Sequence, residues 1–449
     1  MHEILISVVA FIVLIGLMVV VHEFGHFAVA KLCRVRVEAF SVGFGPRLFG
    51  IKIGETDYKI CLLPLGGFVK MTGETPGEEN VADDPAAFTS HPRWQRMLIG
   101  FAGPFSNFVL AFVLMFFYFA WFNEVPSVRP AAVEWVTPGA MADQAGLKAG
   151  DRFTQFGAVA NPDLGAILET MNAKAGATIP ATVDRAGVPV SLQLHLPAGD
   201  KAGDLLAAGF YPHYADKPLT IDQVVSGSAA DEAGLRAGDT VDSIDGYAFH
   251  TLEPLLDYLQ IGKGKPITLG VRGANGAQKT LVVHPRVQDG GWRLGITAQP
   301  YGDLPMRRSP IHVAQASARS YDYCVEGSLM IGQMLKKLVT HQASMKQLSG
   351  PVGIAVVAGK AAETKDWASK FGLASAISLN LGILNLLPFP ILDGGMILFL
   401  LIESIIRQDI SMAIKERIYQ AAFVLIVVFF AFVIFNDVSK LTVFTHMRP

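Results

Sequence analysis

Two histidines and a glutamate in the pattern H-E-x-x-H could hold a metal ion and activate a water molecule. They are His22, Glu23 and His26. On a helix, residues four apart lie on one face, so both imidazoles can bind one Zn²⁺ while the adjacent carboxylate acts as a general base. The alternative is a polar collar at the end of a membrane helix, with the imidazoles reaching toward the interface. A third ligand elsewhere in the chain would favour the metal site.

The element that must carry this motif is an apolar run at residues 4–21, interrupted only by Ser7 and Gly16. At about 1.5 Å per residue, the run is long enough to cross the hydrocarbon core as a helix. Ionisable side chains at that depth are costly without partners, so they mark candidate functional sites. The run lacks a basic leader and a small-residue cleavage site. We therefore expect a retained membrane helix and not a signal peptide.

The composition indicates a membrane protein with sizeable soluble parts. Of 449 residues, 51% are hydrophobic and 17% are charged, whereas soluble proteins carry about 25% charged residues. The formal net charge of −2 argues against a nucleic-acid partner. Cys33, Cys61 and Cys324 are odd in number and have no C-x-x-C spacing, which argues against a disulfide framework and against cysteine zinc ligands.

A third ligand is available in the apolar segment 373–402. It contains Pro388 and Pro390, which break the helical hydrogen bonds, followed by Asp393. A lone carboxylate at membrane depth requires a partner, and a metal held by the first motif would supply one. The structural alternative is that Asp393 caps a helix after a proline kink. The sequence favours Asp393 as the third zinc ligand.

Four transmembrane helices are expected. They cover residues 1–27, 97–122, 373–402 and 416–436. Basic residues gather between the first and second helices and between the third and fourth, so both connections should lie in the cytoplasm. The metal site would then face the cytoplasm, while both termini and the large soluble portion would lie on the outer side of the bilayer. Within the second span, the stretch 103–107 (G-P-F-S-N) suggests close helix packing.

The cytoplasmic loop 28–96 should contain a small membrane-associated β-sheet. Short alternating stretches flank a turn at Gly54–Asp57, and residues 65–71 form a further strand candidate. One interpretation is a sheet that dips toward the metal site and pairs with an extended substrate, with Gly43, Tyr58 and Gly67 as substrate-binding candidates. An ordinary cytoplasmic hairpin remains an equal alternative.

The soluble portion contains an internal repeat. Residues 138–151 match residues 226–239, with nine of the fourteen positions identical and three more conservatively replaced. The copies lie 88 residues apart, about one small domain each. Each is followed by a helix candidate, at residues 164–172 and 252–260, and residues 240–244 read as a strand before a D-G turn.

The A-G-L-x-x-G-D element in both copies resembles a pair of bacterial PDZ domains, at residues 131–212 and 213–300. The resemblance implies α/β domains that bind an extended peptide or C-terminus by strand addition. Gly209 and Gly295 would then belong to the carboxylate-binding loops. The pair could equally act as a steric filter above the membrane, and both interpretations stay open.

Residues 306–347 have a loose helical period of apolar and charged positions. This pattern predicts an amphipathic helical segment on the outer membrane face or beside the next span. The alternative is a linker helix packed on the second soluble domain.

Three motifs together resemble the site-2 protease family of intramembrane zinc metalloproteases. They are H22-E-F-G-H26, G103-P-F-S-N107 and N385-L-L-P-F-P-I-L-D393-G-G. The resemblance implies zinc ligation by His22, His26 and Asp393, general-base catalysis by Glu23, and contact of the substrate backbone by Asn385 and Asn380. The order of spans and the tandem insertion resemble the Gram-negative branch of the family, which implies a multi-pass protein of the bacterial inner membrane.

On substrates, the resemblance implies cleavage within single-span membrane proteins. These would be an anti-sigma factor already cut outside the membrane, whose release serves envelope-stress signalling, and remnant signal peptides. The tandem PDZ domains would exclude bulky uncut proteins on the periplasmic side. A non-catalytic membrane scaffold that binds exported protein tails is the alternative function. A zinc transporter is disfavoured, because transporters carry paired repeats of broken helices and here only the third span is broken.

Overall fold

The computed structural model describes residues 2–74, 84–128, 132–199, 203–213, 219–273, 276–288, 290–298, 305–340, 350–364 and 366–440. The chain divides into two compact units. The first joins the residues up to Asn123 with those from Ser309 onward, and the second spans Glu124–Arg308. The first unit is mainly helical, and the second contains the internal repeat.

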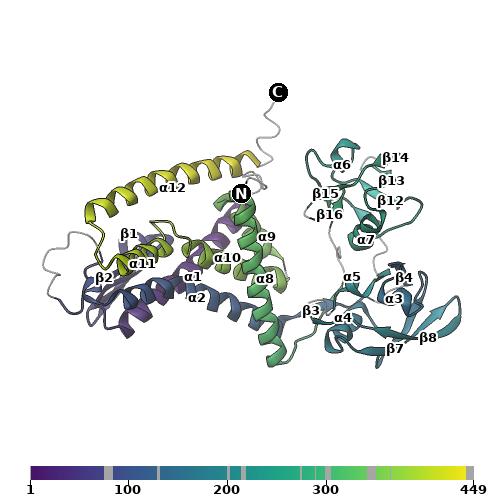
Figure 1. Cartoon of the computed structure of the whole chain (residues 1–449), viewed down its shortest axis with the longest axis horizontal. Coiled ribbons are helices and arrows are strands. Elements are labelled where there is room, and N and C mark those ends of the chain that lie inside the picture. The colour runs from purple at the N-terminus through teal and green to yellow at the C-terminus, as the bar shows by residue number, and fades with distance from the viewer. Residues whose placement is uncertain are drawn as a thin grey trace. The chain divides into compact units, whose positions relative to one another are not determined.

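The first unit is built on long apolar helices, of which α1 packs along α2 (Figure 1). Among the described residues, three helices are long and apolar enough to cross a membrane: Ile4–Leu32, Arg93–Phe122 and Ala413–Asp437. The helices of this unit are α1 (His2–Leu32), η1 (Phe88–Ser90), α2 (Arg93–Phe117) with its π-helical extension η2 (Tyr118–Phe122), α8 (Val313–Val339), α9 (Pro351–Glu363), α10 (Trp367–Asn385), α11 (Asp393–Ile406) and α12 (Met412–Lys440).

The predicted third span, residues 373–402, is two helices and not one. It includes most of α10 and α11, and the chain turns sharply between them at residues 386–392. The predicted segment 306–347 also divides: it begins as a short strand and continues as helix α8, while residues 341–347 lie outside the described part of the chain. One side of α8 packs on α2 and α10, and apolar side chains such as Leu329 and Met330 remain exposed.

The loop after α1 forms a small sheet from two long strands, β1 (Val37–Ile53) and β2 (Thr56–Met71). Both strands bend, so that residues 39–42 of β1 pair with residues 57–60 on one side and with residues 67–70 on the other. The outer part of β1 pairs back onto β2 next to the tight turn Ile53–Thr56. Among the described residues, the strand segment 67–71 is therefore an outer strand of this sheet.

The second unit contains two similar halves, each with its own apolar core. The first half comprises β4 (Ala132–Val136), α3 (Met141–Gln144), β5 (Arg152–Phe156), β6 (Val159–Ala160), α4 (Leu164–Ala173), β7 (Thr178–Arg185), β8 (Val188–His195), α5 (Leu205–Ala208) and β9 (Phe210–His213). The second comprises β10 (Leu219–Thr220), β11 (Gln223–Val224), α6 (Ala229–Glu232), β12 (Thr240–Ile244), α7 (Leu252–Gly262), β13 (Ile267–Arg272), β14 (Gln278–Val283), β15 (Arg286–Gln288), β16 (Gly291–Arg293) and β17 (Ile296–Thr297).

The repeated residues make the same local bonds in both halves. Asp143 accepts a hydrogen bond from the Gly139 N–H at 2.7 Å, and Asp231 accepts one from the Gly227 N–H at 2.8 Å. The final aspartate of each copy likewise accepts from the backbone N–H three residues earlier, at 2.9 and 3.0 Å. The identical positions of the repeat are thus those that close its turns. Both helix candidates and the strand at residues 240–244 begin at the residues expected.

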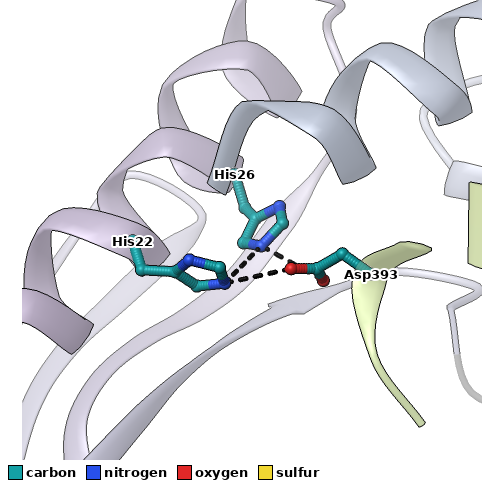
Figure 2. A group of neighbouring side chains, drawn as sticks. All are labelled: His22, His26 and Asp393. Carbon is teal, nitrogen blue, oxygen red and sulfur yellow. Dashed lines mark hydrogen bonds and ion pairs between the residues drawn. The ribbon is translucent and has the colours of Figure 1, made fainter. Parts of the chain in front are cut away.

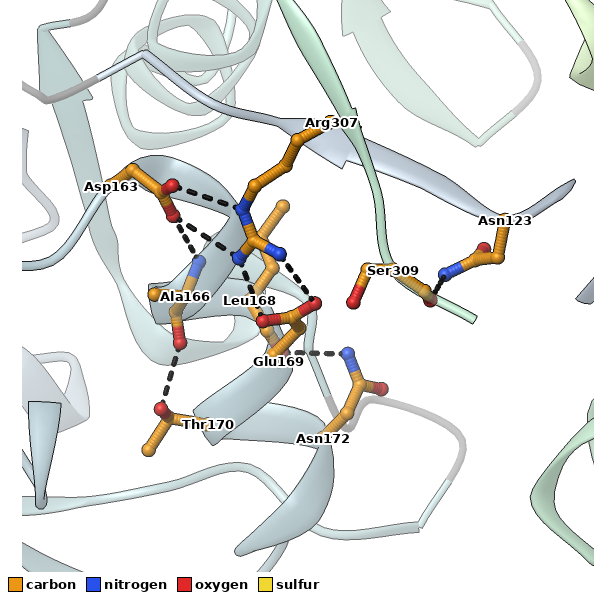
Figure 3. Close-up of polar contacts among 9 residues, drawn as sticks. All are labelled: Asn123, Asp163, Ala166, Leu168, Glu169, Thr170, Asn172, Arg307 and Ser309. Atoms are coloured by element: carbon orange, nitrogen blue, oxygen red, sulfur yellow. Dashed lines mark hydrogen bonds and ion pairs between the residues drawn. The ribbon is translucent and has the colours of Figure 1, made fainter. Parts of the chain in front are cut away.

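The second unit begins and ends in one strand pair, β3 (Glu124–Pro126) with β18 (Met306–Arg308). Arg307 of β18 bonds the carboxylates of Asp163, just before α4, and of Glu169 within it, with Nε 3.0 Å from Asp163 and Nη2 2.8 Å from Glu169 (Figure 3). These hydrogen bonds from the guanidinium raise the pKa of Arg307. Asp163 also caps α4 by accepting from the Ala166 N–H at 2.6 Å. The returning strand is therefore fixed to the first half.

Candidate metal centre

Three side chains from two distant segments converge on one point (Figure 2). His22 and His26 lie one turn apart on α1, and their Nε2 atoms are 3.2 Å apart. Asp393, the first residue of α11, places Oδ2 3.1 Å from His22 Nε2 and Oδ1 3.4 Å from His26 Nε2. Both imidazoles are buried. The only group of three or more possible metal ligands found among the described residues is this one.

These separations match the requirements of a zinc ion. Two ligand atoms that each lie about 2.0 Å from a tetrahedral zinc are about 3.3 Å from one another. The separation of the two Nε2 atoms, 3.2 Å, and the distances from His22 Nε2 to Asp393 Oδ2 and from His26 Nε2 to Asp393 Oδ1, 3.1 and 3.4 Å, fall around this value. Asp393 Oδ2 is buried, and apart from its ion-pair contact with His22 Nε2 it accepts no hydrogen bond from the residues that the structure describes. Two imidazoles and a carboxylate of this kind, with one position left for water, form the ligand set of a catalytic zinc site.

The break between α10 and α11 brings Asp393 to the histidines. Pro388 and Pro390 lack an N–H group, so the helix cannot continue through them. The backbone instead closes short turns, in which the Phe389 N–H donates to Leu387 at 2.7 Å and the Leu392 N–H donates to Phe389 at 2.9 Å. The following Gly394 and Gly395 pack directly on this turn, where a Cβ atom would collide with backbone carbonyls. Both positions must therefore be glycine, because the start of α11 packs directly against the backbone of the preceding turn.

Close packing of α2 against α1 holds the histidine-bearing face in place. A side chain at Gly25 would collide with the carbonyl of Ala102, and one at Gly103 would collide with the His26 ring. Ser106 Oγ donates across the interface to the Val21 carbonyl at 2.8 Å. The prediction of close helix packing at residues 103–107 is confirmed.

In each histidine, the outer ring nitrogen, which is the Nδ1 atom that faces away from the candidate metal position, lies against α2. His26 Nδ1 is 2.8 Å from the carbonyl of Ile99, and His22 Nδ1 is 3.0 Å from the amide of Asn107. Asn107 is fully buried. The sequence placed Asn107 in a helix-packing patch, where an asparagine can hydrogen-bond across helices, but it did not identify His22 as the partner. A polar amide at membrane depth was the available signal, because such a group requires a specific partner.

Glu23 lies in the wall of a cavity of about 940 Å³ that also exposes the three converging side chains. It is half-buried, and the backbone N–H of Val69 bonds its carboxylate. Phe68 and Val69, from the outer strand segment of the sheet, line the same cavity. A carboxylate beside a metal position and next to the outer strand of a sheet can move protons for a substrate held there.

The remaining candidates of the first unit fall into two groups. Asn385 lies at the centre, with Nδ2 3.4 Å from His22 Nε2, and Gly67 packs against Glu23. Asn380 is exposed and is not among the described residues that line the cavity. Tyr58 belongs to an inner segment of the sheet and packs on Phe27 and Phe40.

Gly43 lies at the bend of β1, with φ of +87°, and it too is absent from the described cavity wall. The structure therefore brings Asn385 and Gly67 to the candidate metal centre and leaves Asn380, Tyr58 and Gly43 away from it.

Gly209 and Gly295 occupy equivalent places in the two halves of the second unit. Both have positive φ, +78° and +81°, and each accepts a backbone hydrogen bond at its carbonyl, from Thr137 at 2.9 Å and from Val225 at 2.8 Å. Gly295 lines a smaller cavity of about 210 Å³ beside α7. Gly209 ends helix α5, whose Leu205 and Leu206 line a cavity of about 130 Å³.

Comparison with known proteins relates the whole chain to one family. The family model Peptidase family M50 matches residues 10–429. The chain is 32% identical to the "Regulator of sigma-E protease RseP" of Salmonella typhimurium strain 14028s, covering 98% of this chain and 100% of that protein. It is also 32% identical to the protein of that name from Escherichia coli K12, covering 96% and 98%. A Vibrio cholerae protein named as a zinc metalloprotease is 32% identical over 98% and 100%.

Proposed function

Because the chain belongs to peptidase family M50, the site-2 proteases, and is an intramembrane zinc metalloprotease, we propose that His22, His26 and Asp393 hold its zinc. The observation that supports this proposal is the convergence of their three ligand atoms within 4.8 Å of one another. The ligands come from two helices that the broken segment brings together. No cysteine belongs to the group.

The proposed chemistry is hydrolysis of a peptide bond inside the membrane. When bound, zinc would acidify a water molecule and polarise the scissile carbonyl. Glu23, in the wall of the same cavity, takes a proton from the attacking water and returns it to the leaving amine. Asn385 Nδ2, 3.4 Å from His22 Nε2, is placed to donate a hydrogen bond to the substrate backbone beside the scissile bond.

The outer strand segment at residues 67–71 is the proposed binding surface for the substrate. A transmembrane helix bonds its own carbonyls, so it must become extended before a general base can act on it. A substrate strand is added beside the outermost strand of a sheet, and this outer strand borders the cavity through Phe68 and Val69. Tyr58 cannot serve in this way, because its segment is paired on both sides.

The distal part of the sheet is proposed to contact lipid. Its side chains include large apolar groups that are strongly exposed, namely Phe49, Ile51, Ile53, Ile60 and Leu62. Exposed apolar patches of this kind mark membrane or protein interaction sites. The hairpin would thus anchor the substrate-binding edge at membrane depth.

The two halves of the second unit are proposed to be PDZ domains that control access from the periplasmic side. Their shared turn geometry and the cavity beside Gly295 support this assignment. Either peptide binding at Gly295 and Gly209 or exclusion of bulky proteins would serve that control. The proposed substrates are single-span membrane proteins, namely a pre-cleaved anti-sigma factor and remnant signal peptides. The relatives named regulators of sigma-E protease support the first of these.

The test uses the full-length enzyme in membranes with a single-span substrate, and mass spectrometry of the products with and without a zinc chelator. Glu23→Gln should lower cleavage by at least about 10²-fold while keeping its zinc, since general acid–base catalysis contributes that much. Glu363→Gln, at an exposed position of α9, is the matched control. Cleavage at the wild-type rate by Glu23→Gln would refute the proposed base. Stoichiometric zinc in Asp393→Ala would remove Asp393 from the ligand set.

A further inference from the structure

Asn107 has an unusual position for a membrane-helix asparagine. It is fully buried on α2, and its side-chain nitrogen Nδ2 lies 3.0 Å from Nδ1 of His22. Its Oδ1 accepts no hydrogen bond from any residue that the structure describes. A buried polar group without a partner is costly, so its presence beside a candidate zinc ligand requires an explanation.

In His26, the ring nitrogen that faces away from the candidate metal position, Nδ1, carries the ring proton. His26 Nδ1 lies 2.8 Å from the Ile99 carbonyl, which can only accept, so Nδ1 carries the ring proton. Its Nε2 is then a free lone pair that points at the centre. A neutral histidine that binds a metal through one ring nitrogen usually donates the proton of its other nitrogen to an acceptor.

The same requirement applies to His22. Its Nε2 faces His26 and Asp393 at 3.2 and 3.1 Å, so zinc binding there leaves the ring proton on Nδ1. The group within reach of that proton is Asn107. The two ends of a carboxamide have the same shape, and which end is oxygen follows from the hydrogen bonds. With the amide turned so that Oδ1 faces His22, the Nδ1–H has its acceptor.

We propose that Asn107 is a positioning residue that accepts a hydrogen bond from His22 Nδ1 through Oδ1 and so holds the ring in the tautomer and orientation needed for zinc. This inference rests on the proposed role of His22 as a ligand. The backbone around Asn107 is itself fixed, because Ser378 Oγ of α10 donates to the Asn107 carbonyl at 2.8 Å. Helix α10, which leads into the turn at residues 386–392, therefore helps to fix the residue that we propose orients His22.

The test measures zinc affinity of purified full-length variants by competition with a chromogenic chelator. Asn107→Leu keeps the approximate shape and removes the acceptor, and should weaken zinc binding by about 10- to 100-fold, as loss of such outer partners does. Asn107→Asp keeps an acceptor and should bind zinc within a few-fold of wild type. Asn436→Leu, which removes another buried membrane-helix asparagine, should leave zinc affinity unchanged.

The outcomes separate this inference from the ligand assignment. His22→Ala should lose zinc; if it retains zinc, the ligand set itself is wrong. If His22→Ala loses zinc but Asn107→Leu binds it as tightly as wild type, only the role of Asn107 is overturned. Asn107→Asp decides the question if Asn107→Leu does not fold: zinc binding as weak as that of His22→Ala would show that the acceptor is not what matters.

Discussion

At the residue scale, both proposed histidine ligands obtain their orientation from the same neighbouring helix. Ile99 and Asn107 lie about two turns apart on α2, and each faces the outer nitrogen of one ring. Between them, Gly103 allows α2 to approach His26 closely. Helix α2 thus supplies a hydrogen-bond partner for each ring and, between the two partners, the space that the His26 ring occupies. Substitutions on this face of α2 should therefore alter the positions of the proposed zinc ligands.

Substitution Gly103→Ala should displace the His26 ring. The added methyl group would collide with the ring, because Nε2 and its two neighbouring carbons surround that position. A ligand moved by even a fraction of an ångström no longer meets the distance and angle requirements of zinc. We expect at least a tenfold loss of zinc affinity, measured by chelator competition, and a parallel loss of proteolysis.

The matched control for this prediction is Gly100→Ala, one turn earlier on the same helix. There the new methyl group would meet the end of the flexible Met396 side chain and not a ligand. Zinc affinity should stay near the wild-type value. Equal losses in both variants would mean that general disruption of α2 packing, and not contact with His26, is responsible.

The sequence predicts the three proposed ligands, but it does not predict the residues that orient their side chains. His22 and His26 follow from helical spacing, and Asp393 follows from the cost of a lone carboxylate in the membrane. The role of Asn107 depends instead on how closely α1 and α2 approach, which is a property of tertiary packing. Asn380 shows the opposite error: it shares a motif with Asn385, yet five residues of helix turn it away from the centre and leave it exposed.

At the scale of elements, the small sheet shows why strand prediction does not give strand order. The turn near Gly54 and the strands beside it follow from local pattern. The bend of β1 at Gly43 and Gly45, both with φ of +87°, makes one strand act as two. Tyr58 then lies inside the sheet and the segment after Gly67 lies at its edge.

In the first half of the second unit, the ion pair between the buried Asp151 and the partly exposed Arg185 should make stability depend on pH. Burial alone would raise the pKa of Asp151, but hydrogen bonds from Arg185 and the Lys148 N–H outweigh burial and hold its pKa below the usual value. Arg185 approaches Asp151 with both Nε and Nη2 at 2.7 Å. A lowered folded-state pKa means that the stabilisation is complete above the unfolded value of about 3.9 and declines as the pH falls below it.

Replacement Asp151→Asn should therefore destabilise this half at pH 7 by about 1–3 kcal/mol, with a smaller difference from wild type at pH 3. Hydrogen exchange of peptides from β5 and β7, corrected for the intrinsic rate at each pH, measures the effect. The equivalent Asp239 accepts from the Arg236 N–H, and the described residues provide it no arginine ion pair. Asp239→Asn should thus show a smaller loss at pH 7. A loss of equal size in both variants would contradict the role given to Arg185.

At the scale of the whole molecule, the sequence predicts the two repeated units of the soluble portion correctly. It predicts less well how the apolar segments are divided into helices. The repeat can be recognised in the sequence because the same side chains, at the same spacing, close the turns in both halves. The apolar stretch 373–402 reads as one span by hydropathy, yet its turn at residues 386–392 divides it into α10 and α11. Hydropathy records the apolar character of a segment and not its direction, so orientation requires a direct measurement.

That measurement is labelling of single cysteines in a variant with Cys33, Cys61 and Cys324 replaced by serine. The proposed orientation puts the second unit in the periplasm and the connection between α11 and α12 in the cytoplasm, as the basic residues near that connection predict. Gln278→Cys on β14 and Gln408→Cys in the connection are the same substitution at two exposed positions. In spheroplasts, a membrane-impermeant maleimide should label Gln278→Cys at once and Gln408→Cys only after the membrane is permeabilised. Labelling of Gln408→Cys in intact spheroplasts would reverse the orientation and would place the metal centre's cavity, which Lys415 and Glu416 also line, on the periplasmic side.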